Sequence, residues 1–301
     1  MRILVTDGMD KTAMAQLREL GHEVVEQFYE PDQLGKALRD FDVAVVRSKT
    51  KVRANHIDEA KGSRLKLLLR GGVGVDNIDV AYAKENGIDV KNTPNASSQS
   101  VAELAMGHMF ACTRYISIAG HTMREDKWEK KTYGKGIELQ GKTLGIVGFG
   151  RIGQHLGVMA KAIGMNVVAF ARHPNAAVSE KLGIPYVSMD ELLATSDFIS
   201  LHAPAVDGGA LVNEASIAKM KDGVVIINTS RGANVDEAAL LAALESGKVR
   251  AAGLDVYADE PTSNKALYSH PMVSCTPHIG AATVEAQKRI GAEIVEIIKA
   301  M

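Results

Sequence analysis

The chain has 301 residues, of which 46% are hydrophobic and 24% are charged. These proportions are typical of globular proteins and argue against a disordered or fibrous chain, and the length favours two domains over one. The 35 Lys and Arg residues nearly balance the 36 Asp and Glu residues, for a formal net charge of −1, so we expect no nucleic-acid partner.

Short apolar runs alternate with helical patterns in the first part of the chain. Strands are predicted at 3–5, 43–46 and 65–69, and a helix at 12–20. This alternation is typical of strand–helix units around a parallel sheet. Because the chain begins directly on a strand and has no apolar run of about 18 residues, we expect neither export nor membrane insertion.

A serine-rich segment follows these units. Ser97, Ser98 and Ser100 offer capping hydroxyls ahead of the small and apolar residues 101–106, a pattern that predicts the start of a helix. We expect this helix, which lies within 94–124, to bridge two domains.

A second series of strands is predicted at 143–147, 167–170, 198–201, 224–228 and 251–256. The segment 283–301 then carries Ile290, Ile294, Ile297 and Ile298 at helical spacing, and we expect this apolar face to pack back on the first domain. The predicted fold class is α/β, with two doubly wound parallel-sheet (Rossmann-like) domains and a cleft between them.

Only two cysteines are present, Cys112 and Cys275, and they are far apart in the sequence. They lack the paired spacing of a zinc site or of a disulfide framework, so we expect no metal. A reducing cytoplasm is the simplest compartment for such a chain.

A glycine pattern G-x-G-x-x-G stands where a strand gives way to a helix. Gly148 permits a tight turn, Gly150 lets backbone N–H groups approach a pyrophosphate, and Gly153 allows the helix to pack closely on the strand. Strand, turn, helix and next strand follow at the spacing of a dinucleotide site, so we expect the loop to bind a dinucleotide.

The choice between NAD and NADP is open. A NAD site usually has an Asp or Glu about 20 residues past the glycines that accepts the ribose hydroxyls. Here Ala171, Arg172 and His173 follow the strand 167–170 instead. Arg172 is suited to a 2′-phosphate, or it is an ordinary solvated cation, so NAD is expected with NADP possible.

Candidate catalytic groups follow the later strands. Hydride transfer from a hydroxy acid needs a base for the hydroxyl proton and a cation for the carboxylate. Arg231 comes just after the strand 224–228, and a guanidinium there suits a carboxylate. His278 is the predicted base, and Glu260 is predicted to orient its imidazole.

Together these motifs resemble the D-2-hydroxyacid dehydrogenase family over nearly the whole chain, at 148–153, 201–204, 220–236, 253–261 and 276–278. The resemblance implies an NAD(P)-dependent oxidoreductase in which Arg231, Glu260 and His278 are catalytic. The residues it implies for the cofactor are Gly148, Phe149, Gly150, Arg151, Ile152, Gly153, Ala171, Arg172, His173, His202, Ala203, Pro204, Thr229, Ser230, Asp255, His278 and Gly280.

The resemblance also implies a domain organisation. Residues 1–95 and 283–301 would form a flavodoxin-like substrate domain, and 96–282 a dinucleotide-binding Rossmann domain. Members of the family are usually homodimers joined through the cofactor domains. A small 2-hydroxy or 2-keto acid would be the substrate.

Within the family, the first-domain loops resemble those of short D-3-phosphoglycerate dehydrogenases, and 301 residues leave no room for the C-terminal regulatory domain of longer members. We therefore expect 3-phospho-D-glycerate as substrate, on the way to serine. The residues predicted to bind it are Arg47, Ser48, Lys49, Lys51, Arg70, Gly72, Val73 and Gly74.

Two alternatives stay open. The first is reduction of glyoxylate, hydroxypyruvate or another short 2-keto acid, for which the basic residues between Arg47 and Lys51 would be incidental. The second is a non-enzymatic corepressor that shares the fold and senses a dinucleotide. Robust substrate turnover distinguishes an enzyme from such a corepressor.

Overall fold

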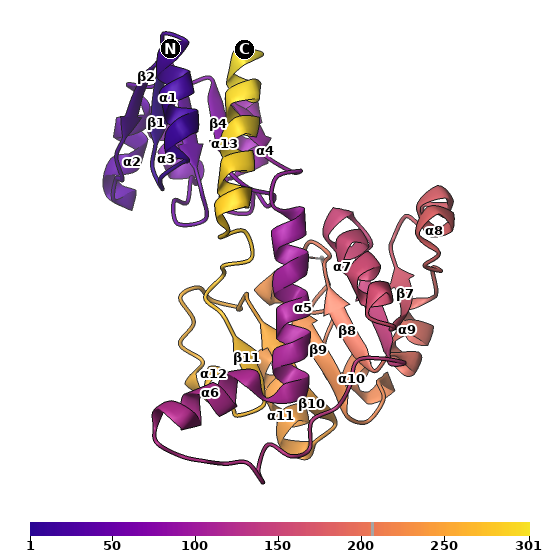
Figure 1. Cartoon of the computed structure of the whole chain (residues 1–301). Coiled ribbons are helices and arrows are strands. Elements are labelled where there is room, and N and C mark those ends of the chain that lie inside the picture. The colour runs from indigo at the N-terminus through magenta and orange to yellow at the C-terminus, as the bar shows by residue number, and fades with distance from the viewer. Residues whose placement is uncertain (206–207) are drawn as a thin grey trace. The chain divides into compact units, whose positions relative to one another are not determined.

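The computed structural model describes residues 1–205 and 208–301, in which strands and helices alternate along the chain (Figure 1). They form two compact units, one of residues 1–98 with 281–301 and one of residues 99–280. Both units are built on an all-parallel sheet, which confirms the predicted α/β fold class.

The first unit holds a five-stranded sheet in the order β2-β1-β3-β4-β5, which is the flavodoxin order. Its strands are β1 (Arg2–Val5), β2 (Glu23–Glu26), β3 (Val43–Val46), β4 (Leu67–Arg70) and β5 (Asp89–Asn92). Its helices are α1 (Lys11–Glu19), α2 (Pro31–Leu38), α3 (Ala54–Ala60), α4 (Val80–Glu85) and α13 (Val284–Lys299). Helices α1 and α13 cover one face of this sheet, and α2, α3 and α4 cover the other.

Helix α13 is the last helix of the chain and packs against the first helix, α1. Thr283 caps it by accepting a hydrogen bond from the N–H of Ala286. Ile290, Ile294 and Ile298 are buried in the same core as α1 and β1, and Figure 1 shows α13 alongside α1. The expectation that this segment packs back on the first domain is confirmed.

The second unit holds a six-stranded sheet in the order β11-β10-β9-β8-β6-β7. Its strands are β6 (Thr143–Val147), β7 (Asn166–Phe170), β8 (Phe198–Leu201), β9 (Val224–Asn228), β10 (Val249–Leu254) and β11 (Val273–Cys275). An isolated parallel bridge joins Ala169 to Tyr186 beside β7. Counting this bridge as a minimal strand gives the Rossmann order 3-2-1-4-5-6 with one strand added.

Helices cover both faces of this sheet, so its strands are almost wholly apolar. One face is covered by α5 (Ser98–Arg114) and α7 (Arg151–Ala162). Buried residues of α9 (Met189–Thr195), α10 (Glu214–Lys219), α11 (Glu237–Ser246) and α12 (Lys265–Tyr268) cover the other. The remaining elements are α6 (Ile116–Arg124), α8 (Ala176–Leu182) and the short 3₁₀ helix η1 (Gly232–Asn234).

Helix α5, which was predicted to bridge the two domains, begins at Ser98, at the end of the first unit's first segment, and its apolar face belongs to the core of the second unit. Ala102, Ala105 and Met109 are completely buried there against β6 and β9. The helix ends at Arg114. Tyr115 follows with a left-handed backbone, φ 58°, and α6 begins directly after it.

Among the described residues, no three His, Cys, Asp or Glu side chains converge as metal ligands. Within that same part of the chain, no helix combines the length and apolar character needed to span a bilayer. Cys112 is buried and Cys275 is exposed, and both thiols are free.

Candidate functional site

The loop between β6 and α7 adopts the turn that its glycines predict. Gly148 has φ 94°, and a Cβ placed on it would lie 2.6 Å from the Ala203 nitrogen and from the His202 carbonyl carbon. A Cβ on Gly153 would lie 2.6 Å from the Gly148 oxygen. Both positions therefore require glycine for packing, one at the turn and one where α7 meets the strand.

Gly150 is glycine for a different reason. Its φ of −80° suits any residue, and a Cβ there would have no atom within 4 Å. It precedes the first turn of α7, whose unpaired N–H groups and dipole favour an anion. Open space above a helix N-terminus, at the carboxyl edge of β6, is what a pyrophosphate requires, so these residues fit a dinucleotide.

The other residues of this loop divide between core and surface. Phe149 is buried and its ring meets Tyr186 edge to face, with ring centroids 5.7 Å apart. Ile152 packs on the same core, whereas Arg151, the first residue of α7, is exposed. Of these three side chains, only that of Arg151 is placed at the surface, where it could reach a ligand.

The end of β7 has the cationic character that the sequence indicates. Ala171 is half-buried, and Arg172 and His173 are exposed. Among the described residues, none forms a hydrogen bond or ion pair with the Arg172 side chain. The position at which a NAD site usually has a carboxylate therefore has a small residue followed by a cation.

Two polar atoms at the sheet edge that carries the glycine loop are buried without a hydrogen-bond partner among the described residues. One is Nδ1 of His202, just after β8, and the other is Oγ1 of Thr229, just after β9. Nε2 of His202 lies 2.8 Å from Ser200 Oγ, and burial lowers the pKa of His202 to about 4. Buried polar groups are rarely unpaired, so these atoms fit the polar parts of a bound dinucleotide.

The backbone after β9 is fixed by Asn228. Its side-chain oxygen accepts hydrogen bonds from the N–H and the hydroxyl of Ser230, and its amide donates to the Arg231 oxygen at 2.8 Å. Arg231 follows, half-buried, with Nη1 donating to the Ser230 oxygen at 2.6 Å. A Cβ on Gly232 would overlap the Tyr257 carbonyl, so this glycine lets the two loops meet.

His278 and Glu260 form the pair that the sequence predicts. Nδ1 of His278 lies 2.7 Å from Oε2 of Glu260, and a little over a third of each side chain is exposed. Burial opposes ionisation of Glu260. The ionised form is favoured by the hydrogen bond and charge of His278, by the Tyr257 N–H and by the charge of Arg231, and together these outweigh burial. The pKa of Glu260 is therefore below its ordinary value. At neutral pH, Glu260 is an ionised carboxylate that orients the imidazole.

Asp255, directly after β10, anchors the loop that carries His278. Its carboxylate accepts hydrogen bonds from the Thr276 hydroxyl at 2.6 Å and from the N–H groups of Ile279 and Gly280, each at 2.8 Å. These contacts flank His278, whose backbone is left-handed with φ 53°. Such a conformation costs about 1–3 kcal/mol for a residue other than glycine, so surrounding contacts must hold it.

All the residues above belong to the second unit and follow strands β6, β7, β8, β9, β10 and β11. Because the sheet is parallel, its strands end at one edge, where ligands bind in doubly wound folds. Ala203 and Pro204 lie at the same edge, after β8. The structure thus brings the predicted catalytic and cofactor residues to one edge of one sheet.

The predicted substrate residues lie in the first unit, in the loops after β3 and β4 and, for Arg70, at the last position of β4. The loop after β3 is held by two residues that sequence reasoning missed. Asp7 accepts hydrogen bonds from the N–H groups of Arg47 and Thr50, and Asn77 donates to the oxygens of the same two residues. The position of Asp7 at the end of β1 could have indicated this role, because β1 is the neighbour of β3.

Some of the predicted substrate residues already have other partners. The ammonium of Lys49 lies 3.8 Å from the centroid of the Phe28 ring. Arg70 donates to the Gly71 oxygen, and its guanidinium fills the space where a Cβ of Gly72 would be. The Gly72 N–H donates to the Arg70 oxygen, so it is engaged within the loop. Val73 is exposed and Gly74 is half-buried. Ser48, in the loop after β3, is also exposed.

The chain matches a family model. Residues 106–280 match the model described as D-isomer specific 2-hydroxyacid dehydrogenase, NAD binding domain. This range covers most of the second unit, including the glycine loop and the pair of Glu260 and His278.

Known relatives match over the full length of the chain. It is 50% identical over 302 residues to a hydroxypyruvate reductase of Thermotoga maritima, covering 99% of this chain and 97% of the relative. It is 44% identical to a D-3-phosphoglycerate dehydrogenase of Methanocaldococcus jannaschii, covering 99% of this chain but only 57% of that longer protein.

Among solved structures, the chain is similar to D-lactate dehydrogenase from Aquifex aeolicus complexed with NAD and lactic acid. The TM-score is 0.85 and the identity 30%, over 99% of this chain and 94% of that one. The match of fold, family model and sequence leads to one conclusion. The chain belongs to the D-isomer specific 2-hydroxyacid dehydrogenase family, whose members act on CH–OH donors with NAD(P).

Proposed function

We propose that this protein interconverts a short 2-keto acid and the corresponding D-2-hydroxy acid, with His278, Glu260 and Arg231 as its catalytic residues. The observation that carries the proposal is the 2.7 Å contact between His278 and Glu260 at the sheet edge that holds the glycine loop. The positive charge of Arg231 favours the ionised form of the Glu260 carboxylate in this pair.

When bound, the nicotinamide would supply the hydride in the reductive direction and accept it in the other. The guanidinium of Arg231 holds the substrate carboxylate and polarises the adjacent carbonyl. His278 gives a proton to the C2 oxygen during reduction and removes it during oxidation. Ionised Glu260 keeps the imidazole in the tautomer and orientation that this transfer requires.

For the substrate, we favour hydroxypyruvate or glyoxylate, the first alternative of the sequence analysis. The Thermotoga relative, at 50% identity, is named a hydroxypyruvate reductase. The contact of Lys49 with Phe28 and the folding of Arg70 onto its own loop leave fewer cations for a substrate phosphate. An uncharged substrate tail needs no such cations.

The second candidate is 3-phosphohydroxypyruvate, the ketone form of 3-phospho-D-glycerate and a step towards serine. Its support comes from relatives at 40–44% identity that are named D-3-phosphoglycerate dehydrogenases. Arg47 and Lys51 are the remaining cations among the residues predicted to bind the substrate. They would bind the phosphate.

A panel of keto acids tests both candidates. Glyoxylate, pyruvate, hydroxypyruvate and 3-phosphohydroxypyruvate are each supplied with NADH and with NADPH, and oxidation of the dinucleotide is followed by absorbance. We expect the highest kcat/KM for hydroxypyruvate or glyoxylate. A preference for 3-phosphohydroxypyruvate that disappears in Arg47→Ala and Lys51→Ala, but persists in the exposed control Lys36→Ala, would establish the second candidate. No turnover of any keto acid would refute the proposed function.

The same panel tests the cofactor. We propose that the enzyme accepts both dinucleotides, because Ala171 and exposed Arg172 leave the ribose side without an acidic residue. Activity with NADPH should fall in Arg172→Ala while activity with NADH is retained.

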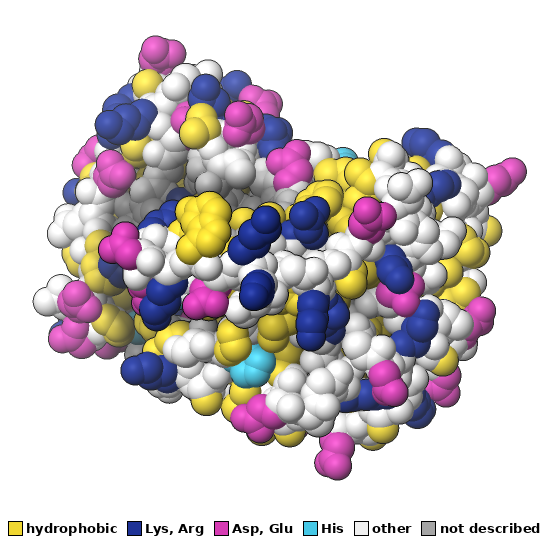
Figure 2. Space-filling model, turned by 60° about the horizontal axis from the view of Figure 1, so that its bottom comes forward, with side chains coloured by type: hydrophobic (Ala, Val, Ile, Leu, Met, Phe, Trp, Pro, Cys, Tyr) yellow, Lys and Arg dark blue, Asp and Glu magenta, His cyan; other side chains and the backbone are white. Residues whose placement is uncertain are grey.

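We also propose a homodimer joined through the second unit. Helix α6 buries none of its residues, and Phe110, Ile116, Met123 and Trp128, in and around it, have large exposed apolar side chains. Figure 2 shows hydrophobic side chains at the surface of one face among charges of both signs. An exposed apolar cluster on a helix without a buried face suits a partner of the same chain.

A further inference from the structure

A buried histidine that the proposed chemistry does not use lies in α5, behind the loop that carries His278. His108 is 3% exposed, and its ring packs against β10 at Gly253. A Cβ on Gly253 would lie 2.6 Å from the His108 Cβ, so a side chain at that position would displace the ring. Histidine at a core position costs free energy unless both ring nitrogens are hydrogen-bonded.

Both nitrogens of His108 have hydroxyl partners, and both partners come from the segment of β11 and the loop after it. Nδ1 lies 2.9 Å from Oγ of Ser274, and Nε2 lies 3.0 Å from Oγ1 of Thr276. Thr276 is two residues before His278. The imidazole therefore links the core of the second unit to the start of the His278 loop.

The Asp255 carboxylate stands at the end of this series of hydrogen bonds and determines the direction of each bond in it. Oδ1 of Asp255 accepts from the Ile279 N–H, and the Thr276 hydroxyl donates its proton to the same oxygen, at 2.6 Å. Thr276 must then accept from the Nε2–H of His108, which leaves Nδ1 to accept from Ser274. Burial lowers the pKa of His108, so the ring is neutral and one of its nitrogens is free to accept.

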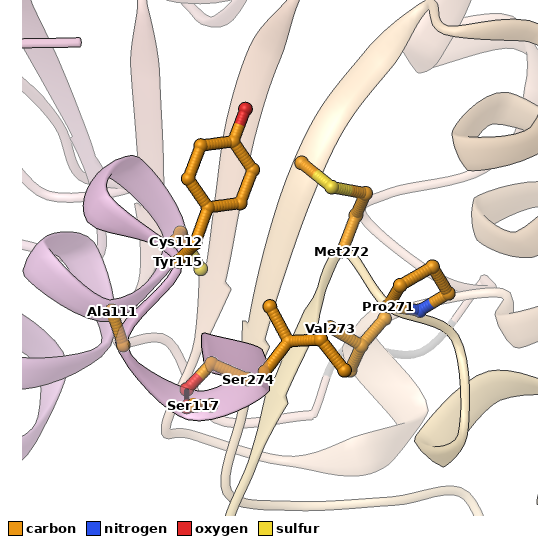
Figure 3. Close-up of a pocket in the computed structure, with 9 residues that line it drawn as sticks. Ala111, Cys112, Tyr115, Ser117, Pro271, Met272, Val273 and Ser274 are labelled. Carbon is orange, nitrogen blue, oxygen red and sulfur yellow. Dashed lines mark hydrogen bonds between the residues drawn. The ribbon is translucent and has the colours of Figure 1, made fainter. Parts of the chain in front are cut away.

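The series of hydrogen bonds begins at a small surface pocket. Ser117, the second residue of α6, has its Oγ 3.1 Å from Ser274 Oγ, and Figure 3 shows the two side by side in the pocket wall. Because Ser274 donates to His108, it accepts from Ser117. Four hydrogen bonds thus run in one direction, from Ser117 through Ser274, His108 and Thr276 to Asp255, and bonds aligned in this way strengthen one another.

We propose that His108 is a positioning residue for His278: through Thr276 and Asp255 it fixes the loop in which His278 meets Glu260. The Asp255 carboxylate accepts a hydrogen bond from the Thr276 hydroxyl on one side of His278. It accepts two more from the N–H groups of Ile279 and Gly280 on the other side. The Thr276 hydroxyl is itself held by His108. This proposal rests on the proposed function in giving His278 the proton transfer, and the contacts it concerns are independent of any substrate.

The test compares three variants on α5. In His108→Leu the link is lost, and a small misplacement of the imidazole should lower kcat about 10- to 100-fold. The affinity for NADH, measured by fluorescence, should change far less than kcat, because the glycine loop lies elsewhere. His108→Gln keeps an N–H donor for Thr276 and should recover part of kcat. Thr113→Val is the matched control, since Thr113 is buried and, among the described residues, its hydroxyl bonds to carbonyls of its own helix.

A second variant and a spectroscopic readout complete the test. Ser274→Ala removes the donor to Nδ1 and the acceptor of the Ser117 hydroxyl but leaves the bond from His108 to Thr276. It should therefore lower kcat less than His108→Leu, and the double variant should be no worse than His108→Leu alone. In ¹⁵N-histidine NMR, the Nδ1–H resonance of His278, assigned by its loss in His278→Ala, should move upfield or broaden in His108→Leu but not in Thr113→Val.

The inference is overturned if His108→Leu only lowers the melting temperature while kcat and the His278 resonance stay as in the wild type. If the wild type reduces no keto acid, the proposed function fails, and the resonance alone then decides whether His108 positions His278.

Discussion

Gly148 and Gly150 are two residues apart, but a methyl group at each would meet different surroundings. Gly148→Ala forces a Cβ into the backbone of residues 202–203 at φ 94°, so it should lower both the melting temperature and dinucleotide affinity. Gly150→Ala meets open space, so the melting temperature should be retained. It should still raise the Kd for NADH about 10- to 100-fold, because hydrogen bonds to a charged group contribute about 1.5–3 kcal/mol. Equal affinity for NADH in Gly150→Ala and the wild type would contradict the assigned pyrophosphate position.

Asp42 makes the stability of the first unit depend on pH. The hydrogen bond from Arg64, with support from the Arg2 N–H, holds the pKa of this nearly buried carboxyl below its ordinary value of 3.8 although burial opposes this. Its contribution is therefore present above that value and is lost as the pH falls through the lower, folded-state pKa. Asp42→Asn should cost about 1–3 kcal/mol in urea unfolding at pH 7 and progressively less below pH 4. Exposed Asp40→Asn is the control, and a loss in Asp42→Asn that does not vary with pH would refute this account.

Functional residues could be predicted where a side chain suited to catalysis follows the end of a strand. Glu260 and His278 each follow a strand, and a parallel sheet brings such positions to one edge. The link of His108 to Ser274 was not predictable, because 166 residues separate them and a histidine in an apolar helix carries no sign of its partner. The same holds for Lys49, whose contact with Phe28 depends on side-chain packing that no motif indicates.

Helix α13 supplies part of the core of the first unit from the far end of the chain. Ile294 is 1% exposed there. Ile294→Ala should lower the free energy of unfolding of that unit by about 2–5 kcal/mol, because it removes buried methyl groups and leaves a cavity. Val158→Ala, at an exposed position of α7, should change it by no more than about 0.5 kcal/mol. Urea unfolding measures both, and equal effects would show that α13 does not complete this core.

At the scale of elements, the sequence predicts strands best where they are buried on both faces. Strands β3, β6, β8 and β9 have the predicted limits, because mostly apolar runs occur there. Strands β2 and β5 were missed, since Glu23–Glu26 and Asp89–Asn92 lie at the edges of their sheet and carry polar residues. β10 ends at Leu254, two residues before the predicted limit, and this leaves Asp255 outside the strand where it can bond the His278 loop.

At the scale of the whole molecule, the proposed dimer makes a definite prediction. Light scattering should give twice the mass of one chain, and Trp128→Glu, at a side chain that is 79% exposed, should shift it to the mass of a monomer. Val284→Glu is the matched control, because this exposed residue begins α13 in the first unit. A wild-type protein that is monomeric at all concentrations, or a Trp128→Glu variant that remains dimeric, would refute the proposed interface.

The central claim is that His278, oriented by Glu260, transfers the proton that accompanies hydride transfer. It is tested most directly by turnover of the best keto acid in His278→Ala, with NADH affinity measured on the same samples. Turnover should fall about 10²- to 10⁴-fold, the range of a lost general acid or base, while NADH affinity changes far less, because the glycine loop is intact. Exposed His155→Ala, on α7, should behave as the wild type. Undiminished turnover in His278→Ala would contradict the account.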